Sequence, residues 1–342
     1  MMPEIATCPL KMDTDKMRPD VSILVVGFNS SSYLETCLAS VGRAITRFTH
    51  EILFVNNGTD TSEGLLKARF PPARVLPSRG NIGFAAANNY LAENAEGSWL
   101  LLLNPDTELQ PNAVDMLLDA AIRHPQYQVL GGVTVGSDNR PAQSTQVELL
   151  SFATILRRMF GRASPKASTQ LDNGLTELDA LTGGFMMVER SCWRALGGLD
   201  PSFFLYAEEL DFFKRLKDRG GRVAQVEASR MYHDIGSGEV FSAARMQFKM
   251  TGRAHYLHKH FSAPYAYACV FLIWASLALR YGAGRAMAWK SERYAYKADA
   301  FAKLVRTPRV WMRGYNSPDA DPRTRSDFVR IAASEVPSEQ PR

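Results

Sequence analysis

Cysteine is scarce in this sequence, and its four cysteines are far apart. Cys8, Cys37, Cys192 and Cys269 form no C-x-x-C pair, which is the spacing of zinc knuckles and redox motifs. The wide spacing of the four cysteines also disfavours a disulfide framework, and it is consistent with a protein of the reducing cytoplasm. The N-terminus shows no basic stretch followed by an apolar segment, so we expect no secretory signal peptide.

Glycine-rich nucleotide motifs are missing too. No G-x-G-x-x-G follows the first apolar run and no G-K-S/T occurs, which disfavours a dinucleotide or a P-loop nucleotide. The longest apolar segment, residues 265–279, is shorter than the roughly 20 residues that a membrane span needs. A buried helix, an interfacial or re-entrant helix and a true span all remain open for this segment.

Strong positive charge is absent from the chain as a whole, since the net charge is only +5, too weak to indicate nucleic-acid binding. The charge is nevertheless concentrated. Between residues 262 and 315 lie nine Lys and Arg residues but only Glu292 and Asp299. Because this basic cluster lies beside the apolar segment, it indicates that this part of the chain contacts an anionic membrane surface. We expect peripheral membrane contact through residues 263–313 and no nucleic-acid partner.

Apolar runs alternate with amphipathic helical patterns over the first 130 residues. Residues 21–26, 51–55 and 100–103 are β-branched or leucine-rich runs, and each is followed by a polar turn. This alternation predicts an α/β fold in which helices flank a largely parallel sheet. The polar turns should then collect at the carboxyl edge of the sheet, where ligands bind.

The predicted edge carries amide and carboxylate side chains. Such groups suit a nucleoside read by side chains, with its phosphates bound through a divalent cation. The residues expected there are Asn29, Asn56, Asp60, Asn81 and Asp106. Taken alone, Asp106 after the leucine run could equally serve a turn, and the asparagines are ordinary turn residues.

Six motifs in order carry a resemblance to a known family. They are VSILVVGFN, EILFVNNGTDTS, GNIGFAAANN, LLLNPDTEL, GGFMMVERSCWRALGGLDPSFFLYAEELDFFKRL and YHDIGSG. The series, over about residues 20–261, resembles the family 2 inverting glycosyltransferases with the GT-A fold, closest to their bacterial rhamnosyltransferase-like branch. The resemblance implies a nucleotide-diphospho-sugar transferase fold with a mostly parallel central sheet and, in this chain, a C-terminal helical appendage.

The resemblance assigns the nucleotide side of the site. It implies that Asn29, Asn56, Asp60, Asn81 and Gly83 bind the nucleotide-sugar. This chain departs from the family pattern V-D-N-x-S-x-D, because Asn56 replaces the carboxylate that usually receives a hydrogen bond from the base. An amide can both accept and donate, so the change bears on nucleotide identity and affinity more than on the fold.

The resemblance also implies a metal. Asn104-Pro105-Asp106 matches the family's D-x-D motif, in which only the last carboxylate need remain, so Asp106 would bind Mg²⁺ or Mn²⁺ and Asn104 would face the nucleotide-sugar. His233 lies where related enzymes place a histidine near the metal or diphosphate. Imidazole suits manganese better than magnesium, so ligation and a hydrogen bond to phosphate are both open.

The acidic cluster should supply the catalytic base. The family usually has E-D-x-D, and this chain has Glu208, Glu209 and Asp211. By motif position the base is Glu209, with Asp211 in reserve. Gly183 and Gly184 either contact the acceptor or only permit a tight entry into a strand.

The resulting hypothesis is a metal-dependent inverting enzyme at the inner face of the cytoplasmic membrane. It would move a sugar, L-rhamnose from dTDP-rhamnose by best match, to a hydroxyl of a glycan or lipid-linked acceptor in cell-surface polysaccharide synthesis. The alternatives are a hexosyl or N-acetylhexosaminyl transferase using a UDP-sugar, and a non-catalytic nucleotide-sugar binder.

The sequence is expected to divide into four parts. They are a flexible tail (1–18), the GT-A domain (19–261, its nucleotide half ending near 133 and its acceptor half starting at 134), an apolar and basic helical appendage (262–315) and a disordered tail (316–342).

Overall fold

The fold consists of two units. The computed structural model describes residues 18–136, 140–141, 146–160, 168–170, 174–233 and 243–316. The first unit comprises Met1–Leu149, Pro165–Pro201 and Glu209–Gly238, and the second comprises Leu150–Ser164, Ser202–Glu208 and Glu239–Arg342. Residues 239–261, which the sequence analysis assigned to the transferase domain, thus group with the C-terminal helices. The two expected tails fall almost wholly outside the described residues.

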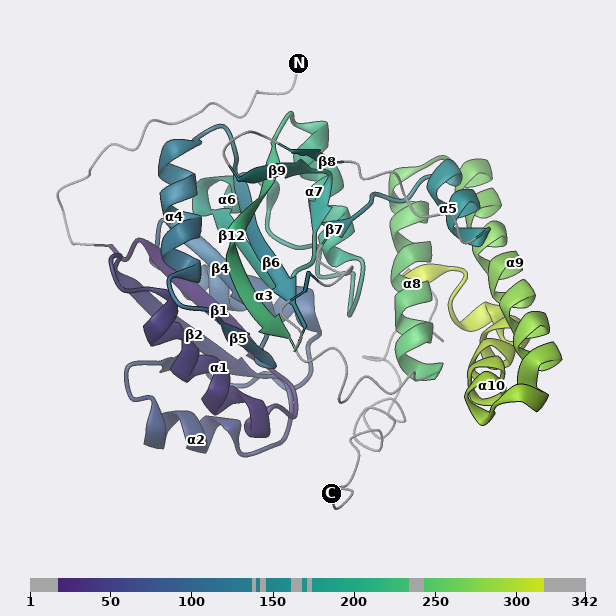
Figure 1. The fold of residues 1–342 in the computed structure, drawn as a ribbon, viewed down its shortest axis with the longest axis horizontal. Coiled ribbons are helices and arrows are strands. Elements are labelled where there is room, and N and C mark those ends of the chain that lie inside the picture. Colours follow the sequence, from purple (N-terminus) through teal and green to yellow (C-terminus); the bar gives the residue numbers. More distant parts are fainter. Residues whose placement is uncertain are drawn as a thin grey trace. The chain divides into compact units, whose positions relative to one another are not determined.

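The first unit is built on a ten-stranded mixed sheet (Figure 1). Strand β1 (Val21–Gly27) pairs in parallel with β2 (His50–Asn56) and β4 (Trp99–Leu103), and the antiparallel β11 (Phe185–Glu189) links β4 to β6 (Val129–Val135). In spatial order the strands are β3 (Arg74–Val75), β2 (His50–Asn56), β1 (Val21–Gly27), β4 (Trp99–Leu103), β11 (Phe185–Glu189), β6 (Val129–Val135), β12 (Val223–His233), β9 (Leu175–Leu178) and β8 (Ser168–Gln170). β5 (Thr107–Leu109) pairs with β12, and β7 (Gln146–Val147) pairs with β10 (Ala180–Leu181).

The leucine run of β4 explains why helices cover both faces of the sheet. Leu101 and Leu103 point into one hydrophobic cluster and Leu100 and Leu102 into the other. All four are at most 3% exposed, and burying each stabilises the fold by about 1.5–3 kcal/mol. The first cluster includes α1 (Ser31–Ala44), α2 (Ser62–Arg69) and α4 (Ala113–Arg123), and the second α3 (Phe84–Asn94), α6 (Arg190–Leu196) and α7 (Glu208–Asp218).

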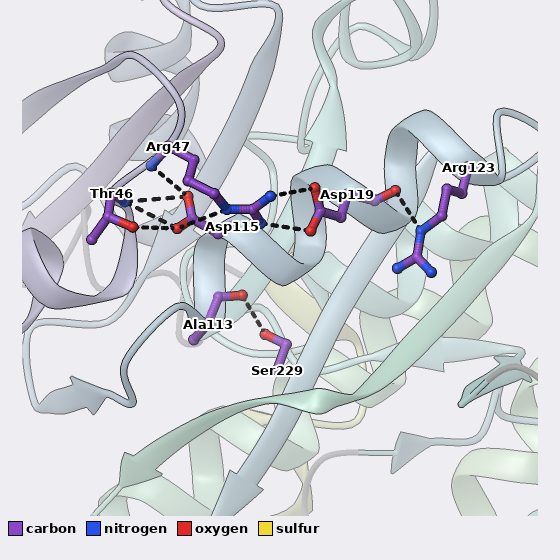
Figure 2. Close-up of polar contacts among 7 residues, drawn as sticks. All are labelled: Thr46, Arg47, Ala113, Asp115, Asp119, Arg123 and Ser229. Carbon is purple, nitrogen blue, oxygen red and sulfur yellow. Dashed lines mark hydrogen bonds and ion pairs between the residues drawn. The ribbon is translucent and has the colours of Figure 1, made fainter.

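A buried carboxylate joins α4 to the turn after α1 (Figure 2). Asp115 is fully buried and accepts hydrogen bonds from the backbone N–H groups of Thr46 and Arg47 and from the Thr46 hydroxyl at 2.9 Å. Arg47 also pairs with Asp119, one turn further along α4, at 2.6 Å. Since the hydrogen bonds of the Asp115 carboxylate all run to this turn, its role is structural: it fastens α4 to the turn that follows α1.

The second unit is helical. It contains α5 (Phe152–Met159), α8 (Ala243–His260), α9 (Ala263–Met287), α10 (Glu292–Arg306) and the short η1 (Ala288–Lys290), η2 (Pro308–Val310) and η3 (Gly314–Asn316). α9 extends the apolar segment to 25 residues, and among the described residues it alone is long and apolar enough to cross a membrane. Only 28% of its most apolar stretch is buried inside the protein. The Trp274 indole of α9 donates to the Val305 carbonyl of α10 at 3.2 Å.

Candidate active site

The carboxyl ends of β1, β2 and β4 meet at one edge of the sheet. Gly27 at the end of β1 lies opposite Asn56 at the end of β2, and Val25 lies opposite Leu103 of β4. Parallel pairing therefore brings the turns that follow these strands to a common rim. The ends of β1, β2 and β4 and the turns after them carry the expected side chains Asn29, Asn56 and Asp106.

The turns after β1 and β2 are in direct contact. Asn29 has a left-handed backbone with φ 50°, which asparagine tolerates better than most residues. A side chain at Gly58 would place its Cβ 2.8 Å from the Asn29 nitrogen. Gly58 is therefore required by close packing, and Asn29 reaches the rim at the expected place.

Both the oxygen and the nitrogen of the Asn56 side-chain amide form hydrogen bonds within the protein. Asn56 is only 3% exposed, its Oδ1 accepts from the Gly58 N–H at 2.8 Å, and its Nδ2 donates to Asp60 Oδ1 at 3.0 Å. Asp60 also accepts from the Ser31 N–H at the start of α1 (2.8 Å) and from the Ser62 hydroxyl (2.9 Å). Burial raises the pKa of Asp60, but these hydrogen bonds outweigh it and hold that pKa below its ordinary value.

We expect Asn56→Asp, which restores the usual family carboxylate, to destabilise the protein by about 1–3 kcal/mol at pH 7, since Asp60 would lose a donor and face a like charge. The deficit should shrink as the pH falls towards 4. Protonation of one of the two adjacent carboxylates relieves the repulsion in the variant, whereas the wild type keeps the stability that the lowered pKa of Asp60 supplies until the pH falls below the ordinary pKa of an aspartate. Thermal unfolding of both proteins between pH 4 and 7 measures this, with Asn56→Ala as the uncharged control. A constant deficit would contradict the coupling of Asn56 to Asp60.

The turn before α3 is fixed by two asparagines. Asn81 Oδ1 accepts from the Gly83 N–H at 3.3 Å, and Gly83 has φ 86°, a conformation that glycine permits without strain. Asn57, which the sequence analysis did not select, is 5% exposed and donates to the Gly83 carbonyl at 3.1 Å. Asn57 thus links the β2 turn to the α3 turn, and its place in the NNG motif was the signal for it.

The two candidate acceptor glycines adjoin the Asn104 turn. The backbone N–H of Asn104 donates to the Gly184 carbonyl at 3.0 Å. A Cβ on Gly184 would lie 2.9 Å from Nδ2 of the Asn104 side chain. A Cβ on Gly183 would only touch the Phe84 ring at 3.5 Å. Close approach therefore requires glycine at Gly184 but not at Gly183.

Asp106 and His233 form a pair. His233 Nε2 lies 3.1 Å from Asp106 Oδ2, with both side chains partly exposed. The pairing of β5 with β12 explains this, because His233 lies opposite Thr107, the residue after Asp106. Residues 127 positions apart thus supply one carboxylate and one imidazole to the rim. No group of three or more His, Cys, Asp or Glu side chains suited to a metal occurs among the described residues.

The Asp106 turn is supported from below by Thr107 and Cys37. The Thr107 hydroxyl donates to the Asn104 carbonyl at 2.7 Å, and Cys37 Sγ lies 3.5 Å from the same oxygen. Burial, with a smaller contribution from the charge of Asp106, raises the pKa of the Cys37 thiol to about 12. The thiol therefore stays protonated and packs the turn instead of acting as a nucleophile.

The three acidic residues of α7 differ in their surroundings. Glu208 is buried and Glu209 is half-buried. Asp211 is fully buried and accepts from Arg215 Nε at 2.8 Å, while Arg215 also donates to the carbonyls of Leu196 and Gly198. Asp211 therefore fastens α7 to the chain after α6, whereas Glu209 is the least buried of the three acidic residues.

Comparison with known proteins places this geometry in a family. A profile of the family described as "Glycosyl transferase family 2" matches residues 22–194, just over half of the chain. The chain is 26% identical over 229 residues, covering 62% of it and 75% of the relative, to N-acetylglucosaminyl-diphospho-decaprenol L-rhamnosyltransferase of Mycobacterium tuberculosis. It is 23% identical over 225 residues, covering 64% and 68%, to the low-salt glycan biosynthesis hexosyltransferase Agl10 of Haloferax volcanii.

Solved structures share the fold. A mannosyltransferase of Pyrobaculum calidifontis in complex with GDP-Man and Mn²⁺ matches 93% of this chain and 87% of its own, with a TM-score of 0.52 and 16% identity. GalNAc-T7 with UDP, GalNAc and Mn²⁺ matches 70% and 48%, with a TM-score of 0.52 and 15% identity. The fold is thus the GT-A fold that the resemblance implied. The chain belongs to glycosyl transferase family 2 and is an inverting glycosyltransferase.

Proposed function

We propose that this enzyme is metal-dependent and moves L-rhamnose from dTDP-rhamnose to a hydroxyl of a glycan or lipid-linked acceptor in cell-surface polysaccharide synthesis. The observation that carries the metal-dependent transfer is the Asp106–His233 pair, 3.1 Å apart at the edge where the parallel strands end. The choice of rhamnose is supported by the rhamnosyltransferase-like motifs and by the Mycobacterium tuberculosis relative named for rhamnosyl transfer.

The Asp106–His233 pair fits a divalent cation. A carboxylate oxygen and an imidazole nitrogen on one rim supply two ligands of the types that Mn²⁺ accepts, and Asp106 alone suits Mg²⁺. Water and diphosphate oxygens are the further ligands that such an ion would accept. When bound, it would neutralise the charge that develops on the leaving nucleoside diphosphate.

The roles of the other predicted site residues are assigned by their position along this edge of the sheet. Asn29, Asp60, Asn81 and Gly83 would bind the nucleotide, and Asn56 would act by shaping the turn between them, since both ends of its amide are occupied. Asn104, Gly183 and Gly184 would lie towards the sugar and the acceptor. The hydrogen bond from the Asn104 N–H to the Gly184 carbonyl supports assigning these two residues to one part of the site.

Glu209 would be the catalytic base. It would take the proton of the acceptor hydroxyl while that oxygen attacks C1 of the sugar from the face opposite the diphosphate, which inverts the anomeric centre. Asp211 is a poorer candidate because its carboxylate is buried against Arg215. Glu208 is buried as well.

A panel of donors tests the proposal. Purified protein is incubated with dTDP-rhamnose and with UDP- and GDP-sugars, with Mn²⁺ or Mg²⁺, and nucleoside diphosphate release and transfer to a membrane extract are measured. We expect the fastest turnover with dTDP-rhamnose. Faster turnover of a UDP-sugar would favour the hexosyl or N-acetylhexosaminyl alternative. Nucleotide binding without turnover of any donor would favour the non-catalytic binder.

We also propose that α9 rests on the inner face of the cytoplasmic membrane. Tyr267, Phe271 and Leu279 are more than half exposed and lie on one face of the helix, while Arg280 and Arg285 add positive charge. Apolar side chains beside basic ones favour an anionic lipid surface.

The double variant Phe271→Ser/Leu279→Ser should therefore lose most of its co-sedimentation with phosphatidylglycerol vesicles, while turnover of a soluble donor persists. Salt should weaken the wild-type binding, because part of the attraction is electrostatic. Phosphatidylcholine vesicles are the control. Undiminished sedimentation of the double variant would contradict an interfacial α9.

A further inference from the structure

The segment that leads into the acidic helix is held by α8. In residues 202–207, the Ser202 hydroxyl lies 2.9 Å from His255 Nε2. The Phe204 ring stacks on Phe248 with centroids 5.8 Å apart. Both partners belong to α8, so the segment is built onto a helix that follows it in the sequence by about 40 residues.

The last described turn holds the same segment. The Tyr315 hydroxyl of η3 accepts from the Leu205 N–H at 3.2 Å and donates to the Leu205 carbonyl. Its ring lies edge-on to His255 at 5.7 Å and to Phe203 at 6.4 Å. Tyr315 is 6% exposed, so one buried side chain satisfies both backbone groups of Leu205.

The backbone next to the acidic residues is strained. Tyr206 and Ala207 have φ values of 67° and 72°, a conformation costly for residues with a Cβ, at about 1–3 kcal/mol each where it persists. Gly252 in the middle of α8 makes room for this turn, since a Cβ there would lie 2.1 Å from the Tyr206 carbonyl oxygen. Lys249 Nζ lies 5.2 Å from the centre of the Tyr206 ring.

We propose that Tyr315 and Gly252 are positioning residues for catalysis, and that they act through the turn of residues 205–207, which leads directly into α7. The inference rests on the proposed function, in which Glu209 is the base. Glu209 follows the strained pair by two residues on a helix that begins at Glu208. Releasing the turn would therefore shift the carboxylate, and a shift of about 1 Å can cost a rate factor of about 100.

Tyr315→Phe tests the hydrogen bonds while keeping the ring. We expect its kcat for nucleoside diphosphate release to fall about 10- to 100-fold, with the donor KM and the calorimetric affinity for dTDP or UDP plus Mn²⁺ unchanged. The matched control is Tyr281→Phe, which removes a hydrogen bond from Arg306 at 3.4 Å and should keep wild-type kcat. The Tm of both variants should stay within about 4 °C of the wild type.

Gly252→Ala tests the packing. Alanine favours a helix over glycine, so a kcat loss at least as large as that of Tyr315→Phe would come from the displaced Tyr206 carbonyl. Gly282→Ala in α9 is the control, because an added Cβ there meets nothing within 4 Å. Wild-type kcat in both Tyr315→Phe and Gly252→Ala would overturn the inference, as would a parallel loss of nucleotide affinity. A wild type that turns over no donor of the panel would instead overturn the proposed function.

Discussion

Glu209→Gln is expected to lower sugar transfer by about 10²- to 10⁴-fold, the range for losing a general base, and to leave nucleotide binding nearly unchanged. Glutamine keeps the size of the side chain but cannot take up the acceptor's proton. The measurement is kcat with the best donor of the panel, alongside the calorimetric Kd for the nucleoside diphosphate with Mn²⁺. Glu63→Gln, a carboxylate in the first turn of α2, serves as the control and should behave like the wild type.

The neighbouring carboxylate should respond differently. Asp211→Asn leaves Arg215 without its charged partner, and breaking such a buried pair costs about 3–5 kcal/mol of folding stability. Its main effect should be a lower Tm, with activity lost in proportion to unfolding. A fully active Glu209→Gln protein, or an Asp211→Asn protein that is stable and inactive, would move the base to Asp211.

The sheet edge could be predicted because its determinants are local. Each of β1, β2 and β4 is an apolar run that ends in polar turn residues, and parallel strands place their carboxyl ends together whatever the length of the connecting helices. The sequence therefore located Asn29, Asn56 and Asp106 on one rim without any knowledge of register. The family and the GT-A fold followed from the same motifs and were confirmed.

The Asp106–His233 contact could not be derived from local pattern. The apolar run of the last strand ends near Val226, but β12 continues to His233 past a shift in its pairing with β6 between Gln225 and Arg230. Its last residues are strand because they pair with β5. That pairing is non-local, so only the resemblance had placed His233 near the metal.

The ranking of the acidic residues was also beyond the sequence analysis, although one signal was present. Asp211 and Arg215 are four residues apart, which on a helix is the spacing of an ion pair on one face. What the spacing could not show is that Asp211 is fully buried. The partners of Ser202–Glu208 on α8 and η3 were out of reach as well, since they depend on how distant helices pack.

Asp106→Ala should have the other large effect: about a 10³-fold loss of metal-dependent turnover, which corresponds to several kcal/mol of lost stabilisation of the leaving diphosphate. His233→Ala should lose less, about 10- to 100-fold, because an ion bound mainly by a carboxylate and diphosphate oxygens keeps most of its ligands. Glu108→Ala is the matched control. It removes a carboxylate two residues away that pairs with Arg43 at 3.0 Å.

The readout that separates a metal ligand from a turn residue is the effect of Mn²⁺ on nucleotide affinity. In the wild type and in Glu108→Ala, Mn²⁺ should tighten binding of the nucleoside diphosphate, because Asp106 would hold the cation and the cation would supply positive charge for the diphosphate. Asp106→Ala should bind the nucleotide with the same affinity with and without Mn²⁺, since Asn29 and Asn81 belong to turns that the substitution leaves intact. An Asp106→Ala protein whose affinity still responds to Mn²⁺ would place the cation elsewhere on the rim and reduce Asp106 to a residue of the β4–β5 turn.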